Sequence, residues 1–474
     1  MATTFAALHV AWWVYGLRPD AQGTYALWQV ASEPWLREDL GGTLLALHSQ
    51  PPLFNLIVGL LGRLPAPLAA SFLALHLALG LGAQWSIARC AGFFGLGSRG
   101  ALLVSALFVA SPSFMLYEHW FFYTFEVACL LPLAALSLVR FLERPSPGRA
   151  SAFFFLLALA SLLRASFHPV FLPAVAAGLA LLLREHRRLL LSAAVLPALL
   201  AWAPAVKNAV LVGRLEPSTW SGMNLARVAL HGLSPAGCER LRTRGLVSDA
   251  FCIGPFLAVE RYPPELHVQP PATAPAVLRE LRKPEGVVNF NQASYVGISR
   301  QLLRDSVAAL RDDPGRFART ALWSLGVYLT PTHEYGLLGP NCARVPGALA
   351  IDRLIAGEGL LALVDERLAD LSPTLLLLLP ALLIAGVARA APTRGPLALE
   401  PGQRALAALC CGLVLACSLI AVCFEVGENN RFRFEIDGLF TILLALAVEG
   451  AWRLRWSTRT RAAPASPGGT PGRR

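Results

Sequence analysis

Long apolar stretches, separated by short polar segments, make up most of this chain. A helix of roughly 20 residues crosses a hydrocarbon core about 30 Å thick and satisfies its own backbone hydrogen bonds there. The pattern therefore predicts an all-α polytopic membrane protein with about 10–12 transmembrane helices. The predicted spans are residues 2–18, 66–89, 100–117, 121–141, 150–164, 167–183, 189–211, 373–390, 404–424 and 437–452. Apolar stretches 318–331 and 345–364 form either a further hairpin or helices resting on the membrane.

Composition supports this class. Of 474 residues, 55% are hydrophobic and only 15% are charged, and the mean hydropathy is +0.53. A soluble domain would be nearer 25% charged. The net charge of +11 does not indicate nucleic-acid binding, because its arginines lie in short loops between spans. The bias toward Arg and Ala is typical of a GC-rich bacterial genome, which favours the bacterial inner (plasma) membrane.

Arginine-rich loops predict the orientation, since such loops stay in the cytoplasm. The arginines concerned are Arg89, Arg99, Arg140, Arg144, Arg149, Arg184, Arg187, Arg188, Arg389, Arg394 and Arg404. Four regions follow: an N-terminal transmembrane module (1–212) with an amphipathic first outer loop (18–50), an outer-face cap (213–372), C-terminal transmembrane helices (373–455) and a disordered basic tail (456–474). Cys238 and Cys252 can form a disulfide if the cap lies outside the cytoplasm.

The first outer loop carries candidate chemistry. Asp20 follows the first span, Glu33 and Asp39 lie in short interfacial helices, and the loop closes with His48-Ser49-Gln50-Pro51-Pro52-Leu53. A carboxylate held at the membrane surface can act as a general base toward an acceptor hydroxyl. For Asp39 and its neighbour Glu38, simple solvation is the commoner role of an exposed acid.

Two short turns on the same side are also polar. Tyr117, Glu118 and His119 form one, and the run from Arg164 to His168 forms the other. Glu126 follows inside an apolar stretch, where a charge requires a cavity or a partner. Arg164 can equally snorkel to the interface. His9 and His76 stand singly within spans and are interpreted as packing residues.

The densest polar run is 425–437, before the last span. It contains Glu428, Asn430, Arg431 and Arg433, with aromatic residues interleaved. Two arginines at the outer interface suit the phosphate of a lipid carrier, because guanidinium offers a fixed fork of donors. Internal pairing with Glu428, Glu435 or Asp437 is the alternative, and the two roles can coexist.

Together, Asp20, the His48–Leu53 element, Tyr117-Glu118 and the run Arg431-Phe432-Arg433-Phe434 resemble the GT-C superfamily of membrane glycosyltransferases. More narrowly, the chain resembles bacterial relatives of the dolichyl-phosphate-mannose protein mannosyltransferases and the lipid A aminoarabinose transferases. The resemblance covers about residues 1–455. It implies transfer of a sugar, with inversion, from a polyprenyl-monophosphate donor to a hydroxyl of a glycan, lipid or protein acceptor on the outer face, without metal or other cofactor.

The resemblance also implies residue roles. Asp20 would be the base, Arg431 and Arg433 would hold the leaving phosphate, and His48 and Glu118 would line the sugar or acceptor pocket. Many relatives have two adjacent acids in the first loop, but Ala21 follows Asp20 here, which leaves Glu33 and Asp39 as alternative bases. The remaining candidate substrate-binding residues are Gln50, Tyr117, His119, Arg164, His168, Glu428 and Asn430.

Two other classes remain open. A flippase or transporter for a lipid-linked glycan would place ionisable residues along a path through the membrane. A non-enzymatic assembly factor of envelope glycan synthesis would need no acid near Asp20.

Overall fold

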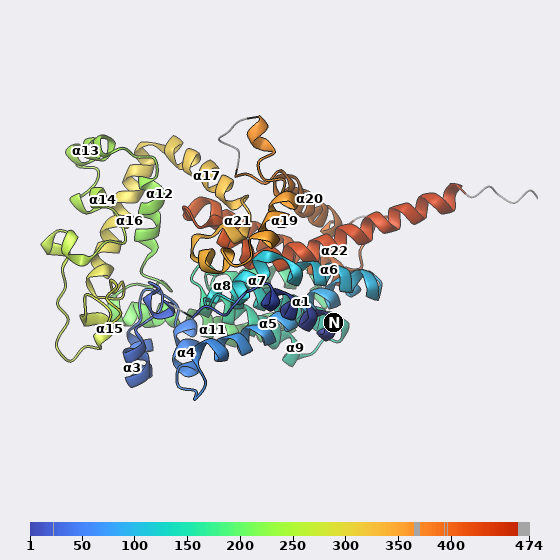
Figure 1. Cartoon of the computed structure of the whole chain (residues 1–474), viewed down its shortest axis with the longest axis horizontal. Coiled ribbons are helices and arrows are strands. Elements are labelled where there is room, and N and C mark those ends of the chain that lie inside the picture. The colour runs from blue at the N-terminus through green and yellow to red at the C-terminus, as the bar shows by residue number, and fades with distance from the viewer. Residues whose placement is uncertain (22, 365–369, 393, 396, 463–474) are drawn as a thin grey trace, which may run out of the picture.

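The computed structural model describes the chain from residue 1 to residue 462, apart from residues 22, 365–369, 393 and 396. Within this part the fold is helical, and the described residues contain no β-strand, only two isolated β-bridges. A bundle of apolar helices forms the main body (Figure 1). The bundle comprises α1 (Ala2–Val14), α5 (Leu68–Phe94), α6 (Ser98–Ala110), α7 (Pro112–Glu118), α8 (Tyr123–Glu143), α9 (Pro147–Leu163), α10 (Phe171–Leu182), α11 (Arg187–Val212), α20 (Pro373–Ala390), α21 (Pro401–Phe424) and α22 (Asn429–Ala462).

Each predicted span falls on one or two of these helices, but their lengths differ. Among the described residues, five helices are long and apolar enough to cross a membrane, and α6 with α7 gives a sixth if this pair, bent by 59°, is one span. Helices α1, α9 and α10 are apolar but shorter. Helix α22 is long enough but carries Glu435, Asp437 and Glu449. The protein is thus a multi-pass helical membrane protein, and full-length apolar helices account for five or six of the predicted 10–12 spans.

Helix α8 lies at the centre of the bundle. In its most apolar stretch 83% of the residues are buried, far more than in the other full-length spans. It packs against α5, α9, α21 and α22. Gly438 of α22 allows a close approach to α8, because a Cβ atom there would lie 2.6 Å from Pro132 Cγ. This contact fixes the start of α22, and with it the polar run 425–437, beside the N-terminal end of α8.

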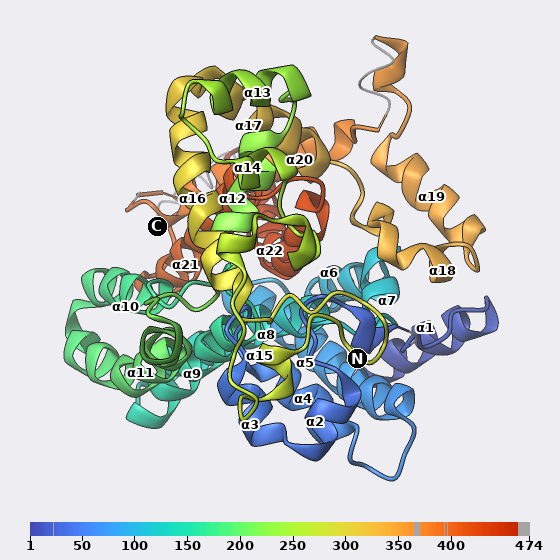
Figure 2. The same ribbon diagram turned by 90° about the vertical axis from the view of Figure 1, so that its left-hand side faces the viewer.

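The segment after α11 forms a second hydrophobic core at one end of the bundle (Figures 1 and 2). Trp220, Phe251, Phe290 and Tyr295 are among its buried residues. Its helices are α12 (Ser221–Leu230), α13 (Pro235–Thr243), α14 (Asp249–Ile253), α15 (Ala276–Arg279) and α16 (Ser294–Asp312). Gly222 lets α12 cross α16 closely, since a Cβ atom would lie 1.8 Å from the Ser299 carbonyl oxygen.

A disulfide joins α13 to α14 within this second core. The predicted pair Cys238 and Cys252 forms it, with an Sγ–Sγ distance of 2.02 Å. Beyond α16 the chain returns to the bundle through α17 (Pro314–Tyr328), α18 (Gly339–Cys342) and α19 (Pro346–Ala356).

The first loop lies at the same end of the bundle and is tied to the second core. It contains the short helices α2 (Glu33–Glu38) and α3 (Leu40–Ala46), and α4 (Leu53–Leu61) leads back to the bundle. The buried ammonium of Lys283 donates to the carbonyl oxygens of Tyr25, Leu27 and Val30 at 3.1, 2.7 and 2.6 Å. Three chain segments distant in sequence therefore meet at this end: the first loop, the second core and the turn before α22.

At the opposite end α22 projects beyond the bundle (Figure 1). It continues to Ala462, so the first residues of the segment 456–474, predicted to be disordered, are helical. Residues 463–474 lie outside the described part of the chain.

Candidate functional site

Two adjoining pockets open where the first loop, the second core and the start of α22 meet. We call the first the arginine pocket; it has a volume of about 440 Å³ and includes Arg164, Arg227 and Arg431. The second, which we call the aspartate pocket, has a volume of about 960 Å³ and includes Asp20. Residues Trp28, Gln29, Arg227 and Glu428 line both pockets, so the two pockets are immediate neighbours.

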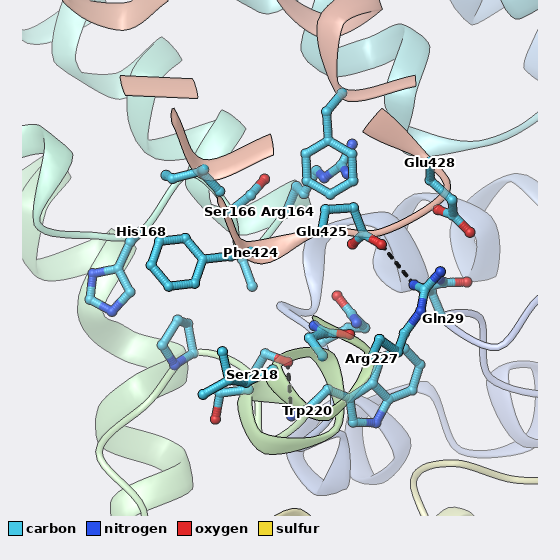
Figure 3. A pocket seen from close by; sticks show the side chains of 18 of the residues that line it. Gln29, Arg164, Ser166, His168, Ser218, Trp220, Arg227, Phe424, Glu425 and Glu428 are labelled. Carbon is cyan, nitrogen blue, oxygen red and sulfur yellow. Dashed lines mark hydrogen bonds and ion pairs between the residues drawn. The ribbon is translucent and has the colours of Figure 1, made fainter. Parts of the chain in front are cut away.

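Three guanidinium groups reach the arginine pocket from three different elements. Arg164 ends α9, Arg227 lies in the last turn of α12, and Arg431 lies in the first turn of α22. Figure 3 shows Arg227 and Glu425 pointing toward each other across the pocket, joined at 2.7 Å between Arg227 Nη1 and Glu425 Oε1. Arginines at one point present several forked donors, which is the arrangement that suits a phosphate group.

Arg431 is held by hydrogen bonds and by aromatic rings. Its Nε donates to Glu428 Oε2 at 3.1 Å, its Nη2 pairs with the same carboxylate, and its Nη1 donates to Thr124 at 3.2 Å. Its Cζ lies 5.3 Å from the ring centre of Tyr335. Guanidinium carries five N–H donors. Arg431 therefore keeps donors for a ligand while its position is fixed.

Arg164 is buried against a ring and an acid. It pairs with Glu435, and its Cζ lies 3.6 Å from the ring centre of Phe432. The lining of the pocket also includes the apolar residues Ile420 and Phe424 of α21, of which Figure 3 labels Phe424. Arginine side chains next to apolar side chains are the combination that a phosphate attached to a hydrocarbon chain requires.

The carboxylates of the α21–α22 turn respond differently to this environment. Burial raises the pKa of Glu425, although Arg227 acts against the rise. Burial also acts to raise the pKa of Glu428, but the charges of Arg431 and Arg227 outweigh it, so that pKa is lowered overall. The ionised Glu428 orients Arg431 at the boundary between the two pockets.

Asp20 reaches the aspartate pocket because its backbone is fixed to the turn after α7. Its N–H donates to the His119 carbonyl oxygen at 2.8 Å, and it forms a bridge with Trp120. The first loop and the Tyr117–Trp120 turn are thus adjacent. Of the predicted binding residues, Gln50, Arg164, His168, Glu428 and Arg431 line the arginine pocket, and Asn430 lines the aspartate pocket together with Glu428.

The alternative bases lie outside both pockets. Glu33 is exposed at the start of α2, and its N–H, like the Ser32 hydroxyl, donates to Glu285. Asp39 is also exposed, and its carboxylate accepts from the Gly42 N–H at 2.8 Å as the N-cap of α3. Neither position favours a role as general base.

His48 is a structural connection and not part of a pocket. Its ring nitrogens lie 2.7 Å from Thr219 Oγ1 and 2.8 Å from the Asn291 carbonyl oxygen, which ties the first loop to the second core. Burial lowers the pKa of His48 to about 4, so the ring is neutral at neutral pH. His48 thus lies outside the two pockets, and its predicted contact with sugar or acceptor stays a prediction.

Tyr117, Glu118 and His119 are buried and line neither pocket. Tyr117 stacks on Phe434 with ring centres 4.0 Å apart, and its hydroxyl donates to the Thr332 carbonyl oxygen. His119 accepts from the Trp13 indole N–H at 2.9 Å. The backbone of this turn holds Asp20 in place, and the predicted substrate contacts of its side chains stay a prediction.

Glu118 instead belongs to a set of buried acid–histidine pairs. It pairs with His9, and Glu126 pairs with His76 at 3.2 Å. The predicted partner of Glu126 is therefore a histidine. His9 and His76, interpreted as packing residues, each lie beside one of these carboxylates; a carboxylate with no polar neighbour inside the bundle would carry a large desolvation cost.

Arg433 also lies outside both pockets. Its guanidinium donates to the Tyr328 carbonyl oxygen and lies 3.8 Å from Asp437. The internal pairing considered for this residue is therefore the observed arrangement.

Sequence reasoning missed several polar residues of the site, among them Gln29, Arg227, Glu334 and Glu425. Arg227 and Glu334 lie in the long segment after α11, where no adjacent motif marks them. Glu334 lines the aspartate pocket; burial, and a hydrogen bond that the protonated Glu334 donates to Glu358, raise its pKa to about 8. Among the described residues, no group of three or more His, Cys, Asp or Glu side chains is arranged to hold a metal ion.

The fold and the site thus define a multi-pass helical membrane protein with a charged two-part pocket at one end of its bundle. No family model, curated protein or solved structure matches this chain in the comparisons made.

Proposed function

We propose that the protein is a membrane glycosyltransferase that moves a sugar from a polyprenyl-monophosphate donor to an acceptor hydroxyl. The observation that carries the proposal is that the two pockets adjoin and share the lining residues Trp28, Gln29, Arg227 and Glu428. A phosphate leaving group and a general base must lie on opposite sides of one reacting carbon. The adjoining arginine and aspartate pockets supply groups of these two kinds.

In the proposed reaction, the lipid phosphate lies in the arginine pocket and the acceptor hydroxyl lies beside Asp20. The Asp20 carboxylate takes the hydroxyl proton as the acceptor oxygen bonds to the anomeric carbon. The bond from this carbon to the phosphate oxygen breaks, and polyprenyl phosphate leaves with the electron pair. Arg164, Arg227 and Arg431 stabilise the charge that develops on it. Attack opposite the leaving group inverts the anomeric centre.

The proposed orientation places the two-part pocket on the outer, periplasmic side of a bacterial inner membrane. Two features support it. The arginine-rich loops lie between spans in the pattern typical of the cytoplasmic side. The Cys238–Cys252 disulfide belongs to the end that carries the pockets, and disulfides persist in oxidising compartments. The second core would then form a cap on the outer face.

The test is sugar transfer by purified protein in proteoliposomes, using a panel of radiolabelled polyprenyl-phosphate sugars with mixed glycan, peptide and lipid acceptors. The wild type is compared with D20N, and with D39N as the matched control from the same loop. We expect transfer that D20N abolishes and D39N preserves. Protein-dependent movement of the donor across the bilayer, with no transfer from any donor, would replace the transferase by a flippase.

A further inference from the structure

The walls of the aspartate pocket suggest what kind of acceptor enters it. Trp28, Trp120, Phe122 and Tyr335 form its aromatic part. Its polar part consists of Asp20, Gln29, Arg227, Thr330, Glu334, Glu428 and Asn430. Large rings mixed with carboxyl and amide groups give a pocket that is neither purely apolar nor uniformly charged.

Trp28 is the aromatic residue best placed to receive a ligand. Its side chain is 44% exposed although its ring is firmly supported, stacked on Phe256 at 5.3 Å between ring centres and packed against Phe290 at 4.9 Å. An indole face carries negative potential and attracts weakly positive C–H groups. The apolar face of a pyranose ring presents such C–H groups, while its hydroxyls point to the rim.

Hydroxyl partners are available around this ring. Gln29 lines both pockets beside Trp28, and its side chain makes no hydrogen bond to any other described residue. Glu334, with its pKa raised to about 8, is mostly protonated at neutral pH; its proton is held by Glu358, so Glu334 offers a ligand an acceptor oxygen. Asn430 contributes less, because its amide already donates to Thr330 and Pro331.

The charge of the pocket argues against an anionic acceptor. Among its described lining residues Arg227 is the single cation, and it is bonded to Glu425 at 2.7 Å and to the Val426 carbonyl oxygen at 2.5 Å. Glu428 and Asp20 face the same space. A phosphate or carboxylate would meet like charges here, which disfavours the headgroup of an anionic lipid.

A peptide acceptor is disfavoured for a different reason. Extended peptides are commonly held by main-chain hydrogen bonds to a sheet edge. The described part of the chain has no strand that could supply one, and the pocket is lined by side chains of turns and helices.

We propose that the aspartate pocket binds an uncharged sugar unit of a glycan as the acceptor, with Trp28 as its stacking platform and Gln29 and Glu334 as hydroxyl partners. The role of this sugar unit as the acceptor of the reaction rests on the proposed function. The binding of a sugar in this pocket is, however, measurable without any transfer.

The first experiment is saturation-transfer NMR on the full-length protein in nanodiscs with a panel of neutral disaccharides. A serine- and threonine-containing peptide and a soluble diacyl lipid serve as comparison ligands. W28A is compared with W323A, since Trp323 is equally exposed at 44% but lines neither pocket. We expect W28A to weaken binding of at least one disaccharide about tenfold and W323A to leave it unchanged.

The second experiment measures transfer with the same acceptors. If the wild type transfers sugar, W28A should raise the KM for the disaccharide about tenfold and leave the KM for the donor within twofold. Disaccharide binding that depends on Trp28, without transfer from any donor, would retain the inference and remove the proposed function. Transfer to peptide or lipid but not to sugar, or equal binding by W28A and W323A, would overturn the inference.

Discussion

Arg431 and Arg433 provide the sharpest prediction, because they are alike in sequence and differ in the structure. Both are buried in the first turns of α22. Arg431 lines the arginine pocket, but Arg433 pairs with Tyr328 and Asp437 away from it. We therefore expect R431K to impair transfer and R433K to have little effect.

The expected magnitude follows from the donors that Arg431 keeps for a ligand. Three of its five N–H groups are engaged by Glu428 and Thr124, which leaves two for the phosphate. A hydrogen bond to a charged group contributes about 1.5–3 kcal/mol. Losing both would slow transfer by about 100-fold to 10,000-fold, since 1.4 kcal/mol is a factor of ten. Lysine keeps the charge but not the fork, so we expect about 100-fold for R431K.

The assay is initial-rate sugar transfer in proteoliposomes, with thermal unfolding measured for each variant to confirm folding. We expect R433K within about threefold of the wild type, and a loss in R431K that appears in kcat/KM. Equal losses of activity in the two variants would refute this reasoning, and so would wild-type activity of R431K. Either result would mean that the donor phosphate does not bind in the arginine pocket.

Three further predictions follow from single features. D20N should lower the transfer rate by at least about 100-fold, as loss of a general base does, while D39N stays within threefold because asparagine caps a helix equally well. Because the pKa of Glu334 is raised from 4.5 to about 8, the folded protein binds more protons than the unfolded chain between these two pH values. The free energy of unfolding should therefore fall as pH rises from 4.5 to about 8. Melting temperatures measured across this range should fall less steeply with pH for E334Q than for the wild type. Reduction of the Cys238–Cys252 disulfide should destabilise the second core by about 2–4 kcal/mol in chemical denaturation, and maleimide labelling of either cysteine before reduction would contradict the pairing.

The helical bundle could be predicted from the sequence because a long apolar run in the membrane, where water is absent, must form a helix to satisfy its own backbone hydrogen bonds. It also predicted that the polar turns gather at one end, since spans of similar length return their connections to the same side. The predicted 10–12 spans are confirmed in part: five helices, or six with α6 and α7 as one span, are long and apolar enough for a crossing, and α1, α9 and α10 are apolar but shorter. Run length alone does not say where a helix ends.

The site was predicted in part, and the failures have a geometric cause. Arg431 and Arg433 are two residues apart, so on a helix they point in directions about 200° apart. Only the rotation of α22 against α8 decides which one faces the pocket. Arg227 and Glu334 enter the site through the packing of the second core, which no local pattern encodes.

The polar residues of the Tyr117–Trp120 turn illustrate the same limit. Glu118 and His9 are 109 residues apart and meet only because α1 packs beside α7. A buried acid signals that a partner exists, but it does not identify that partner. What the structure shows of this turn is its backbone contact with Asp20.

The most direct test of the central claim is a product balance for purified protein supplied with one active polyprenyl-phosphate sugar and an acceptor. Released polyprenyl phosphate and labelled acceptor would be measured in the same reaction, together with the anomeric configuration of the product. The two-part pocket predicts one polyprenyl phosphate released for each sugar transferred, with inverted configuration, and neither product from D20N. Release of polyprenyl phosphate without labelled acceptor, or undiminished transfer by D20N, would contradict it.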